Sequence, residues 1–138
     1  HALPEEEYEA WYAGQLQLAR GEEALTEQDW SEAELLARGE EVYAAQCAGC
    51  HQADGQGVAP VFPALAGNPL MTGDFEAHMD VVYNGRPGTA LQAFGPVLSP
   101  VDMAAVMHYQ RHAFGEAAVS DSSEPVKPKD IIRFAAAQ

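Results

Sequence analysis

The chain has 138 residues, which suits one compact domain with additional length at its ends. Its 21 acidic and 7 basic side chains give a formal net charge of −14, which disfavours nucleic acid or an anionic membrane as a partner and allows a basic protein. No apolar run approaches the ~20 residues that span a bilayer, and the acidic start HALPEEEYEAW lacks the basic and apolar regions of a signal peptide, so we expect a soluble chain.

The first 30 residues are acidic and predict a helical extension. Residues 1–41 hold twelve acidic side chains against Arg20 and Arg38, a net charge of −10. Such a stretch is either a solvated helical arm or a surface for a basic partner, and the sequence leaves both interpretations open.

A capping box opens the next helix, because Ser31 precedes Glu34 by three positions. Apolar residues then recur at helical spacing as far as the sequence CAGCH. Gly39 lies in the same stripe, and since a helical glycine costs roughly 1 kcal/mol relative to alanine, we expect another helix to approach it closely. The stripe consists of Leu35, Leu36, Gly39, Val42 and Tyr43.

The segment after CAGCH is rich in glycine and proline. Residues 52–73 are therefore predicted to form a loop. A helix follows over residues 74–83, with apolar side chains at helical spacing, and Asn84 and Gly85 end it.

A second loop leads to the last strong helix. The sequence Ser99-Pro100-Val101-Asp102 supplies an N-cap, a proline at the first helical position and an acidic first turn. Gly115 ends this helix, and residues 116–138 form a polar tail with a short amphipathic end. No strands are predicted, so the sequence indicates an all-α fold with about three core helices joined by long loops.

The two cysteines, Cys47 and Cys50, are followed directly by His51. This spacing does not suit a disulfide framework. A zinc site needs two further ligands, a thioredoxin-like redox pair needs a βαβ context, and covalent attachment of a c-type haem needs only the string CxxCH. The thiols are one helical turn apart, so both can reach the vinyl groups on one edge of a porphyrin.

The imidazole of His51 can then donate one nitrogen to iron. Its other nitrogen needs an acceptor that fixes the tautomer, commonly a backbone carbonyl, and the loop FPALAG can supply it at Pro63. Long loops in so short a chain usually argue against an assignment, but they are expected if they wrap a large apolar cofactor.

Three stretches together resemble a known family. They are EVYAAQCAGCHQADGQG, FPALAGNP and VVYNGRPGTALQAFGPVLSPVDMAAVMHYQRHAFG, and over roughly residues 35–115 they are similar to the class I cytochrome c domain fused to subunit II of haem–copper cytochrome c oxidases. The opening EEEYEAWYAGQ and the tail EPVKPKDIIRF also resemble that subunit. The resemblance implies a class I cytochrome c fold around one covalent haem c at residues 31–115, a linker at 1–30 from a missing upstream copper-binding domain and membrane anchor, and a C-terminal extension at 116–138.

The resemblance also implies roles for individual residues. By position, it makes Cys47 and Cys50 the thioether anchors. His51 becomes the proximal iron ligand, and Pro63 supplies the carbonyl that orients it.

Further contacts follow from the same comparison. Gly39 and Tyr43 would pack the first core helix against Tyr109 of the last one. Asn84 and Arg86 would lie near the haem edge, where Arg86 is either a propionate partner or an ordinary exposed arginine.

Leu91 is the departure from the family pattern. The family's loop reads Gly-Thr-Ala-Met-Gln-Ala-Phe-Gly, and its methionine sulfur is the sixth iron ligand. A leucine side chain has no lone pair for iron. Since methionine/histidine ligation raises the potential of a c-type haem, its loss lowers the potential and leaves the position open or filled by water.

Three accounts of this position remain: a substitute ligand, a five-coordinate haem, or an engineered change from methionine to leucine. Met71 is a weak candidate substitute because it lies in a loop, whereas the other methionines fit apolar helix stripes and the helical histidines are expected at the surface. We expect that no protein ligand replaces the methionine. The residues less suited to the role are Met79, Met103, Met107, His78, His108 and His112.

The function predicted from these features is electron transfer. The domain is expected to accept electrons from a donor cytochrome or other redox protein and pass them to the copper centre of a terminal oxidase in the respiratory chain, at the periplasmic face of the bacterial inner membrane. Its partners would be the remaining oxidase subunits, with membrane contact only through the upstream part. No catalytic site is expected in this fragment. The alternative is binding or sensing of CO or NO at a five-coordinate haem.

Overall fold

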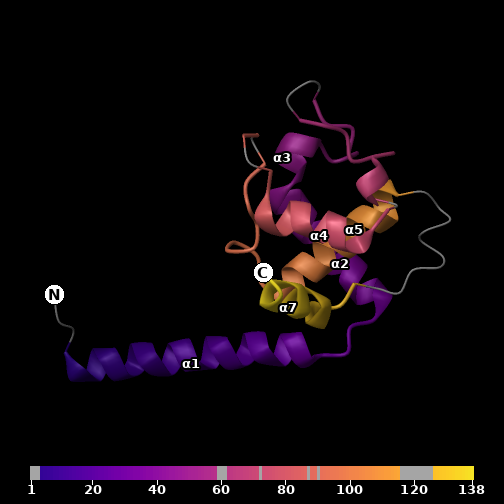
Figure 1. The fold of residues 1–138 in the computed structure, drawn as a ribbon. Coiled ribbons are helices and arrows are strands. Elements are labelled where there is room, and N and C mark those ends of the chain that lie inside the picture. Colours follow the sequence, from indigo (N-terminus) through magenta and orange to yellow (C-terminus); the bar gives the residue numbers. More distant parts are fainter. Residues whose placement is uncertain (1–3, 59–61, 72, 87, 90, 116–125) are drawn as a thin grey trace.

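The computed structural model describes residues 4–58, 62–71, 73–86, 88–89, 91–115 and 126–138. Over these ranges the chain contains no strand, and Val58 and Phe62 form an isolated β-bridge. The all-α prediction is confirmed (Figure 1). The helices are α1 (Glu5–Glu27), α2 (Glu32–Gln46), α3 (Ala48–His51), α4 (Phe75–Asn84), α5 (Pro100–Phe114) and α7 (Pro128–Ala136), with a short 3-10 turn η1 at Pro69–Met71.

The helix boundaries follow the capping signals in the sequence. Ser31 accepts from the backbone of Glu34, whose carboxylate in turn accepts from the Ser31 backbone, so the predicted capping box is present. Asp74 accepts from the Glu76 backbone at the start of α4, and Ser99 caps α5. Each cap occupies a backbone N–H that has no partner inside its helix.

The packing of α2 on α5 depends on Gly39. A Cβ there would overlap the Ala105 carbonyl oxygen and lie 2.6 Å from the Cβ of Tyr109. Beside this contact the Tyr43 and Tyr109 rings lie 5.5 Å apart, centre to centre. The expected close approach of the first and last core helices is therefore confirmed.

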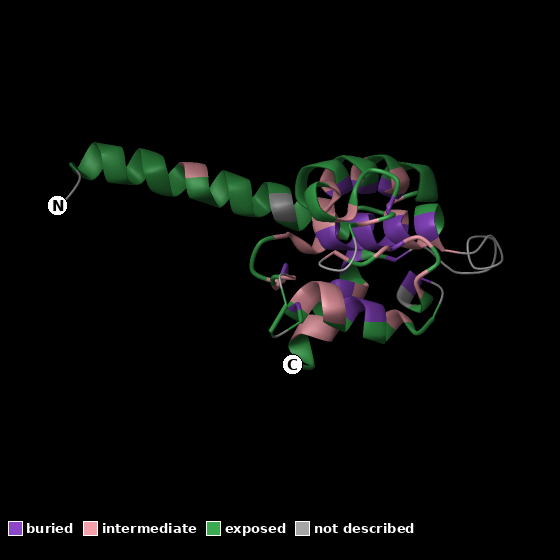
Figure 2. Ribbon diagram, turned by 90° about the horizontal axis from the view of Figure 1, so that it is seen from above, coloured by how far each residue is buried: buried purple, intermediate pink, exposed green. Residues whose placement is uncertain are grey.

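Helix α5 is the centre of the domain and is buried on several sides (Figure 2). Its side chains divide between two apolar clusters, and loop residues complete both of them. The first cluster is Met79, Phe94, Met103, Ala104, Met107, Val126 and Ile131. The second cluster is Tyr43, Leu65, Met71, Val106 and Phe114.

The C-terminal segment contributes to the first cluster. Ile131 of α7 is buried, and the Phe134 ring meets Tyr83 of α4 edge to face at 5.6 Å. The predicted amphipathic end is thus a helix that packs on the core. Residues 116–125 of the predicted tail lie outside the described residues, as do Pro87 and Ala90 of the loop before α5.

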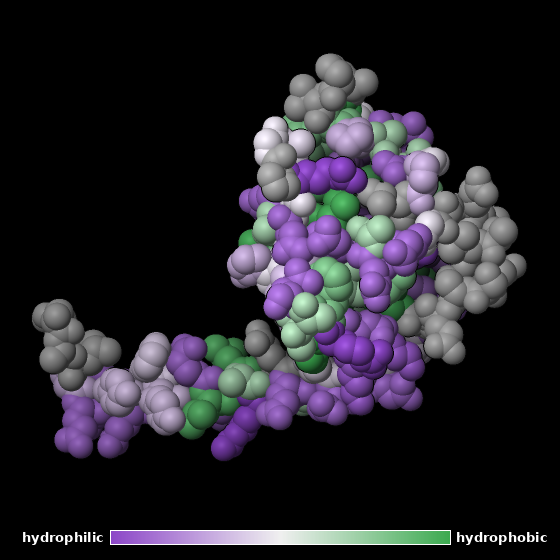
Figure 3. Space-filling model, in the orientation of Figure 1, coloured by the Kyte–Doolittle hydropathy of each residue, from purple (hydrophilic) through white to green (hydrophobic). Residues whose placement is uncertain are grey.

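Helix α1 extends away from the rest of the chain, and its far end lies near the N-terminus (Figure 1). Its C-terminal end meets α5 and α7, whereas five large apolar side chains along it are exposed, and Figure 3 shows apolar groups on this helix. No described helix has the length and apolar composition needed to cross a bilayer. The exposed side chains are Tyr8, Trp11, Tyr12, Leu16 and Leu18.

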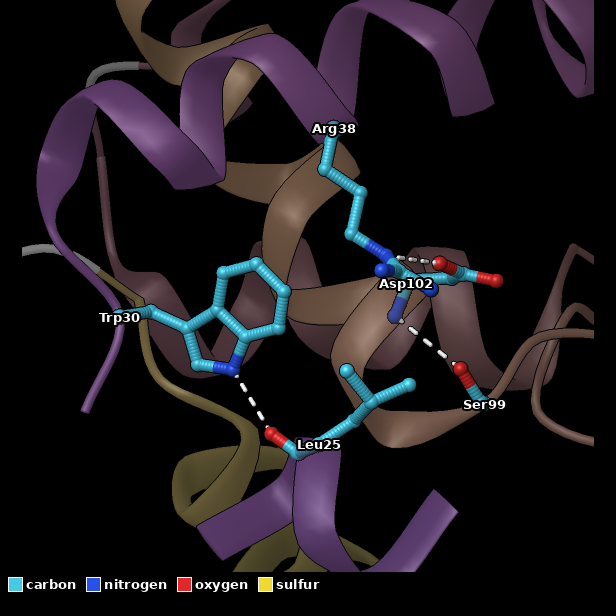
Figure 4. A network of polar contacts seen from close by, with 5 residues as sticks. All are labelled: Leu25, Trp30, Arg38, Ser99 and Asp102. Carbon is cyan, nitrogen blue, oxygen red and sulfur yellow. Dashed lines mark hydrogen bonds and ion pairs between the residues drawn. The ribbon is translucent and has the colours of Figure 1, made fainter. Parts of the chain in front are cut away.

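A polar network fixes the junction between α1 and α2 (Figure 4). The Trp30 indole N–H donates to the Leu25 carbonyl at 2.8 Å, and the Arg38 guanidinium lies 5.4 Å from the Trp30 ring centroid. Arg38 Nε also donates to Asp102 Oδ1 at 2.7 Å, and the Asp102 backbone donates to Ser99 Oγ. The network links the end of α1, the middle of α2 and the start of α5.

Candidate functional site

The two cysteines lie where α2 gives way to the short helix α3. The Cys47 backbone N–H donates to the Tyr43 carbonyl at 2.9 Å, and the His51 N–H donates to the Cys47 carbonyl at 3.0 Å. Both thiols are free, with Cys47 partly buried and Cys50 exposed. Burial, with a smaller contribution from Cys50, raises the pKa of the Cys47 thiol to about 11. One helical turn therefore presents two free thiols and an imidazole.

The loop after α3 returns to hold His51. Its Nδ1 lies 2.9 Å from the Pro63 carbonyl oxygen, which is the predicted hydrogen bond. Gly57 makes this return possible, because its φ is +66° and a Cβ there would lie 2.6 Å from the Pro63 carbonyl oxygen. With the proton on Nδ1 donated to the carbonyl, Nε2 keeps its lone pair for a metal.

This arrangement fits a covalently attached haem. Two unpaired thiols lie one turn apart, and the next side chain is an imidazole with one nitrogen already occupied by a carbonyl. The zinc alternative lacks its ligand set in the described part of the chain, where no group of three or more His, Cys, Asp or Glu side chains is placed to hold a metal ion.

The loop that carries Leu91 is tightly folded against the end of α4. Gly85 has a φ of +70°, and a Cβ on it would lie 2.7 Å from the Leu91 carbonyl oxygen. The Arg86 N–H donates to the same oxygen at 3.2 Å, and the Thr89 hydroxyl donates to the Arg86 carbonyl at 2.7 Å. The half-buried Leu91 side chain packs against the first cluster.

The methionines lie in the apolar clusters. Met71 is 2% exposed and belongs to the second cluster, although it follows a loop. Met79, Met103 and Met107 belong to the first cluster, as their spacing predicted. The absence of a sixth protein ligand stays a prediction, and the weak alternative, Met71, would require this buried side chain to leave its neighbours.

Asn84 and Arg86 are exposed. The Asn84 amide donates to Asp80 Oδ1 at 2.7 Å and to Gln138 Oε1 at 3.0 Å, so this side chain ties α4 to the end of the chain. For the Arg86 guanidinium no ion pair is found with any described residue. Their roles beside the haem stay predictions.

Two of the histidines expected at the surface are buried instead. His78 is 1% exposed, and burial lowers its pKa to about 4. His108 is 5% exposed, its Nε2 lies 3.4 Å from Glu32 Oε1, and burial lowers its pKa as well. The expectation was wrong because tertiary contacts cover both side chains: His108 lies on α5, which is buried on several sides, and His78 of α4 faces Gln110 of α5. His112 is exposed as expected.

One residue near the site had only a weak signal in the sequence. Gln110 of α5 is 5% exposed and places its Nε2 3.9 Å from Cys47 Sγ. Its Oε1 lies 2.9 Å from His78 Nε2. A glutamine on a helix is ordinarily a surface residue, and only its position one turn after Val106 and one turn before Phe114 pointed to the buried face.

Comparison with known proteins gives a consistent picture. The family model described as "Cytochrome C oxidase, cbb3-type, subunit III" matches residues 34–109. The cytochrome c subunit of a quinone alcohol dehydrogenase from Gluconobacter oxydans (strain 621H) is 39% identical over 87 residues, 56% of this chain and 18% of that protein. Subunits of the same description from Gluconacetobacter polyoxogenes and Komagataeibacter europaeus are each 32% identical over 90 residues, 58% of this chain and 19% of theirs.

The chain thus spans about a fifth of the length of the curated relatives it matches. The resemblance to a cytochrome c domain and the covalent haem c that it implies are confirmed. Neither the family nor these relatives carries the description of an oxidase subunit II. The chain belongs to the family described as cytochrome c oxidase, cbb3-type, subunit III, and it contains an electron-transferring cytochrome c domain that binds haem c covalently.

Proposed function

We propose that this domain accepts single electrons from a donor cytochrome and passes them to the copper centre of a terminal oxidase, at the periplasmic face of a bacterial inner membrane. The observation that carries the proposal is the His51–Pro63 hydrogen bond beside two free thiols, in a chain whose family is named for an oxidase. The resemblance of the flanking segments to oxidase subunit II supports this partner over other acceptors.

Different residues of the chain would hold different parts of the cofactor. Cys47 and Cys50 would anchor it, and His51 would bind its iron through Nε2 while the Pro63 carbonyl fixes the ring. Haem c supplies one-electron chemistry when bound. The protein sets the orientation of the imidazole and keeps water from the apolar side chains of the two clusters.

A second candidate is electron transfer inside a quinone-dependent dehydrogenase. The relatives from three organisms are described as cytochrome c subunits of quinone alcohol dehydrogenases, which favours this assembly. The two candidates share the haem and differ in the protein that exchanges electrons with it. Binding or sensing of CO or NO is not favoured by any of these relatives, and we do not propose it as the function.

Stopped-flow oxidation of the reduced haem-loaded chain distinguishes the two candidates. One arm mixes it with the oxidised, soluble copper domain of an oxidase subunit II, and the other mixes it with a short-chain ubiquinone. We expect fast second-order oxidation by the copper domain and a rate with the quinone no greater than that of a buffer control. Fast oxidation by the quinone alone would favour the dehydrogenase and overturn the oxidase assignment.

We infer that the position of Leu91 gives the iron no protein ligand, because the side chain is purely apolar and the methionines pack in the clusters. The ferrous wild-type protein should then bind CO promptly, whereas Leu91→Met should resist CO and have a higher reduction potential. Visible spectra with and without CO measure the binding of CO, and spectroelectrochemistry measures the reduction potential. A wild-type spectrum that CO leaves unchanged would mean that another residue binds the iron, and Met71→Leu would then test Met71.

A further inference from the structure

Two buried polar side chains lie between α4 and the cysteine turn. His78 Nε2 is 2.9 Å from Gln110 Oε1, and Gln110 Nε2 is 3.9 Å from Cys47 Sγ, within hydrogen-bond reach of sulfur. Neither side chain is more than 5% exposed. We call these two residues the His78–Gln110 pair.

The direction of the hydrogen bonds in the pair follows from the donors around it. Arg111 Nη1 lies 3.4 Å from His78 Nδ1, while its Nη2 donates to the Gly73 carbonyl at 2.8 Å. A guanidinium only donates, so Nδ1 accepts and the single proton of the neutral imidazole is on Nε2. His78 is neutral at neutral pH because burial lowers its pKa to about 4.

This tautomer also fixes the amide of Gln110. The His78 Nε2–H donates to the Gln110 carbonyl oxygen, which directs the NH2 group toward Cys47. The reverse orientation of the amide would set two donors against each other. Three donors in series, those of Arg111, His78 and Gln110, therefore point toward the sulfur.

Packing alone does not call for this arrangement. Gln110 lies one helical turn from Val106 and from Phe114, both in the apolar second cluster, which also touches Cys47. Burying an amide and an imidazole is unfavourable unless they are hydrogen-bonded, and an apolar pair of similar volume avoids that cost. A role directed at Cys47 accounts for polar residues in this place.

We propose that the His78–Gln110 pair is a positioning device that directs a hydrogen-bond donor at the Cys47 sulfur and so raises the reduction potential of the haem attached there. The positive end of the amide dipole opposes the additional positive charge of the oxidised state, and hydrogen bonding around the cofactor is one of the means by which a protein sets its potential. The inference deepens the electron-transfer role and is independent of which partner exchanges the electrons.

The test compares reduction potentials of haem-loaded variants by spectroelectrochemistry. Gln110→Leu keeps the volume and removes the donor, and we expect the ferrous-to-ferric ratio at a fixed applied potential to fall about threefold, about 30 mV at 59 mV per tenfold change. His78→Leu frees the amide and should lower the potential in the same direction. The double variant should resemble Gln110→Leu alone, because the two residues act through one contact.

A matched control is His108→Leu, which removes another buried polar side chain of α5 that faces Glu32 instead of Cys47. It should leave the potential unchanged even if it changes stability. An equal shift in His108→Leu and Gln110→Leu, or no shift in Gln110→Leu, would overturn the proposal.

A second measurement keeps the test valid if a variant does not fold. Nitrogen-15 NMR of the wild-type protein reports the tautomer of His78 directly. We expect the proton on Nε2, and a proton on Nδ1 would contradict the direction of the hydrogen bonds and overturn the proposal. Slow oxidation by the copper domain would contradict the proposed partner and leave this proposal unaffected, because neither the reduction potentials nor the His78 tautomer is measured with that domain.

Discussion

At Gly39 a missing side chain sets the distance between two helices. Alanine in a helix is ordinarily about 1 kcal/mol more favourable than glycine. Here the added Cβ overlaps the Ala105 carbonyl, so α2 must move away from α5, at a cost of about 1–3 kcal/mol. We expect Gly39→Ala to lower the free energy of unfolding, measured in guanidinium chloride by circular dichroism.

The matched control is Gly21→Ala in α1, where no described atom lies within 4 Å of the added Cβ apart from the adjacent residues and the helix's own backbone. This change should leave the unfolding midpoint of the core unaltered or slightly raised. If Gly39→Ala were as stable as the wild type, the close contact between α2 and α5 would be wrong.

His78 makes stability depend on pH in a defined direction. Its pKa falls from 6.5 to about 4 on folding, chiefly because burial disfavours the charged imidazole. Below pH 6.5 His78 binds a proton in the unfolded chain but stays neutral in the folded chain. The free energy of unfolding therefore decreases as the pH falls from about 6.5 towards 4. Linkage gives a loss of about 2 kcal/mol between pH 7 and pH 5 that His78→Gln should not show.

Denaturant unfolding of both proteins at the two pH values measures this difference. His112→Gln, which replaces an exposed histidine of α5 and keeps His78, should still lose stability between the two pH values. Parallel profiles for the wild type and His78→Gln would show that His78 is not buried in the neutral form.

These residues also show what the sequence predicts at this scale. The hydrogen bond from His51 to Pro63 was predictable, because a metal-binding imidazole needs an acceptor and only a short loop separates the two residues. The burial of His78 and Gln110 was not, because it depends on α4 and α5 meeting across more than thirty residues of chain. Their polar side chains predict exposure, and the contact between the two helices buries them.

Among the elements, α7 contributes more to the core than its short amphipathic pattern predicts. We expect Ile131→Ala to lower the free energy of unfolding by about 2–4 kcal/mol, because the side chain is 3% exposed and lies in the first cluster. Unfolding should remain a single transition if α7 belongs to the same cooperative unit.

The neighbouring residue provides the control. Ile132 is 45% exposed, and Ile132→Ala should change the stability by no more than about 0.5 kcal/mol. Equal behaviour of the two variants would mean that α7 does not pack on the core in solution.

Helix boundaries were predictable where a local signal exists. Ser31 and Ser99 cap the helices that their sequences indicated, because a hydroxyl three residues before a free N–H needs no tertiary contact. The position of α7 depends on tertiary contacts, since its apolar face fits a cluster built by α4 and α5. An amphipathic pattern predicts that a face is covered and does not identify what covers it.

For the whole molecule, the uneven charge predicts how partners approach. Replacing Glu5, Glu6, Glu7 and Glu9 by glutamine removes four negative charges from the free end of α1. At low ionic strength we expect electron exchange with a basic cytochrome to slow several-fold, measured by stopped flow, and the difference should vanish at high salt.

Arg20→Gln on the same helix changes the charge in the opposite direction and should speed the reaction slightly under the same conditions. If the four-residue variant reacted at the wild-type rate at every salt concentration, α1 would play no part in the encounter.

The length of α1 also sets the rotation of the haem domain about the helix axis, relative to the far end of the helix. The helix has 23 residues, so it is about 35 Å long at 1.5 Å per residue, and its last turn is joined to the rest of the chain by the Trp30–Arg38–Asp102 network. Each residue added to or deleted from α1 turns the haem domain by about 100° around the helix axis relative to the far end. The number of residues in α1 therefore decides which side of the haem domain faces whatever is held at that end, and a deletion of one residue changes that facing far more than it changes the distance.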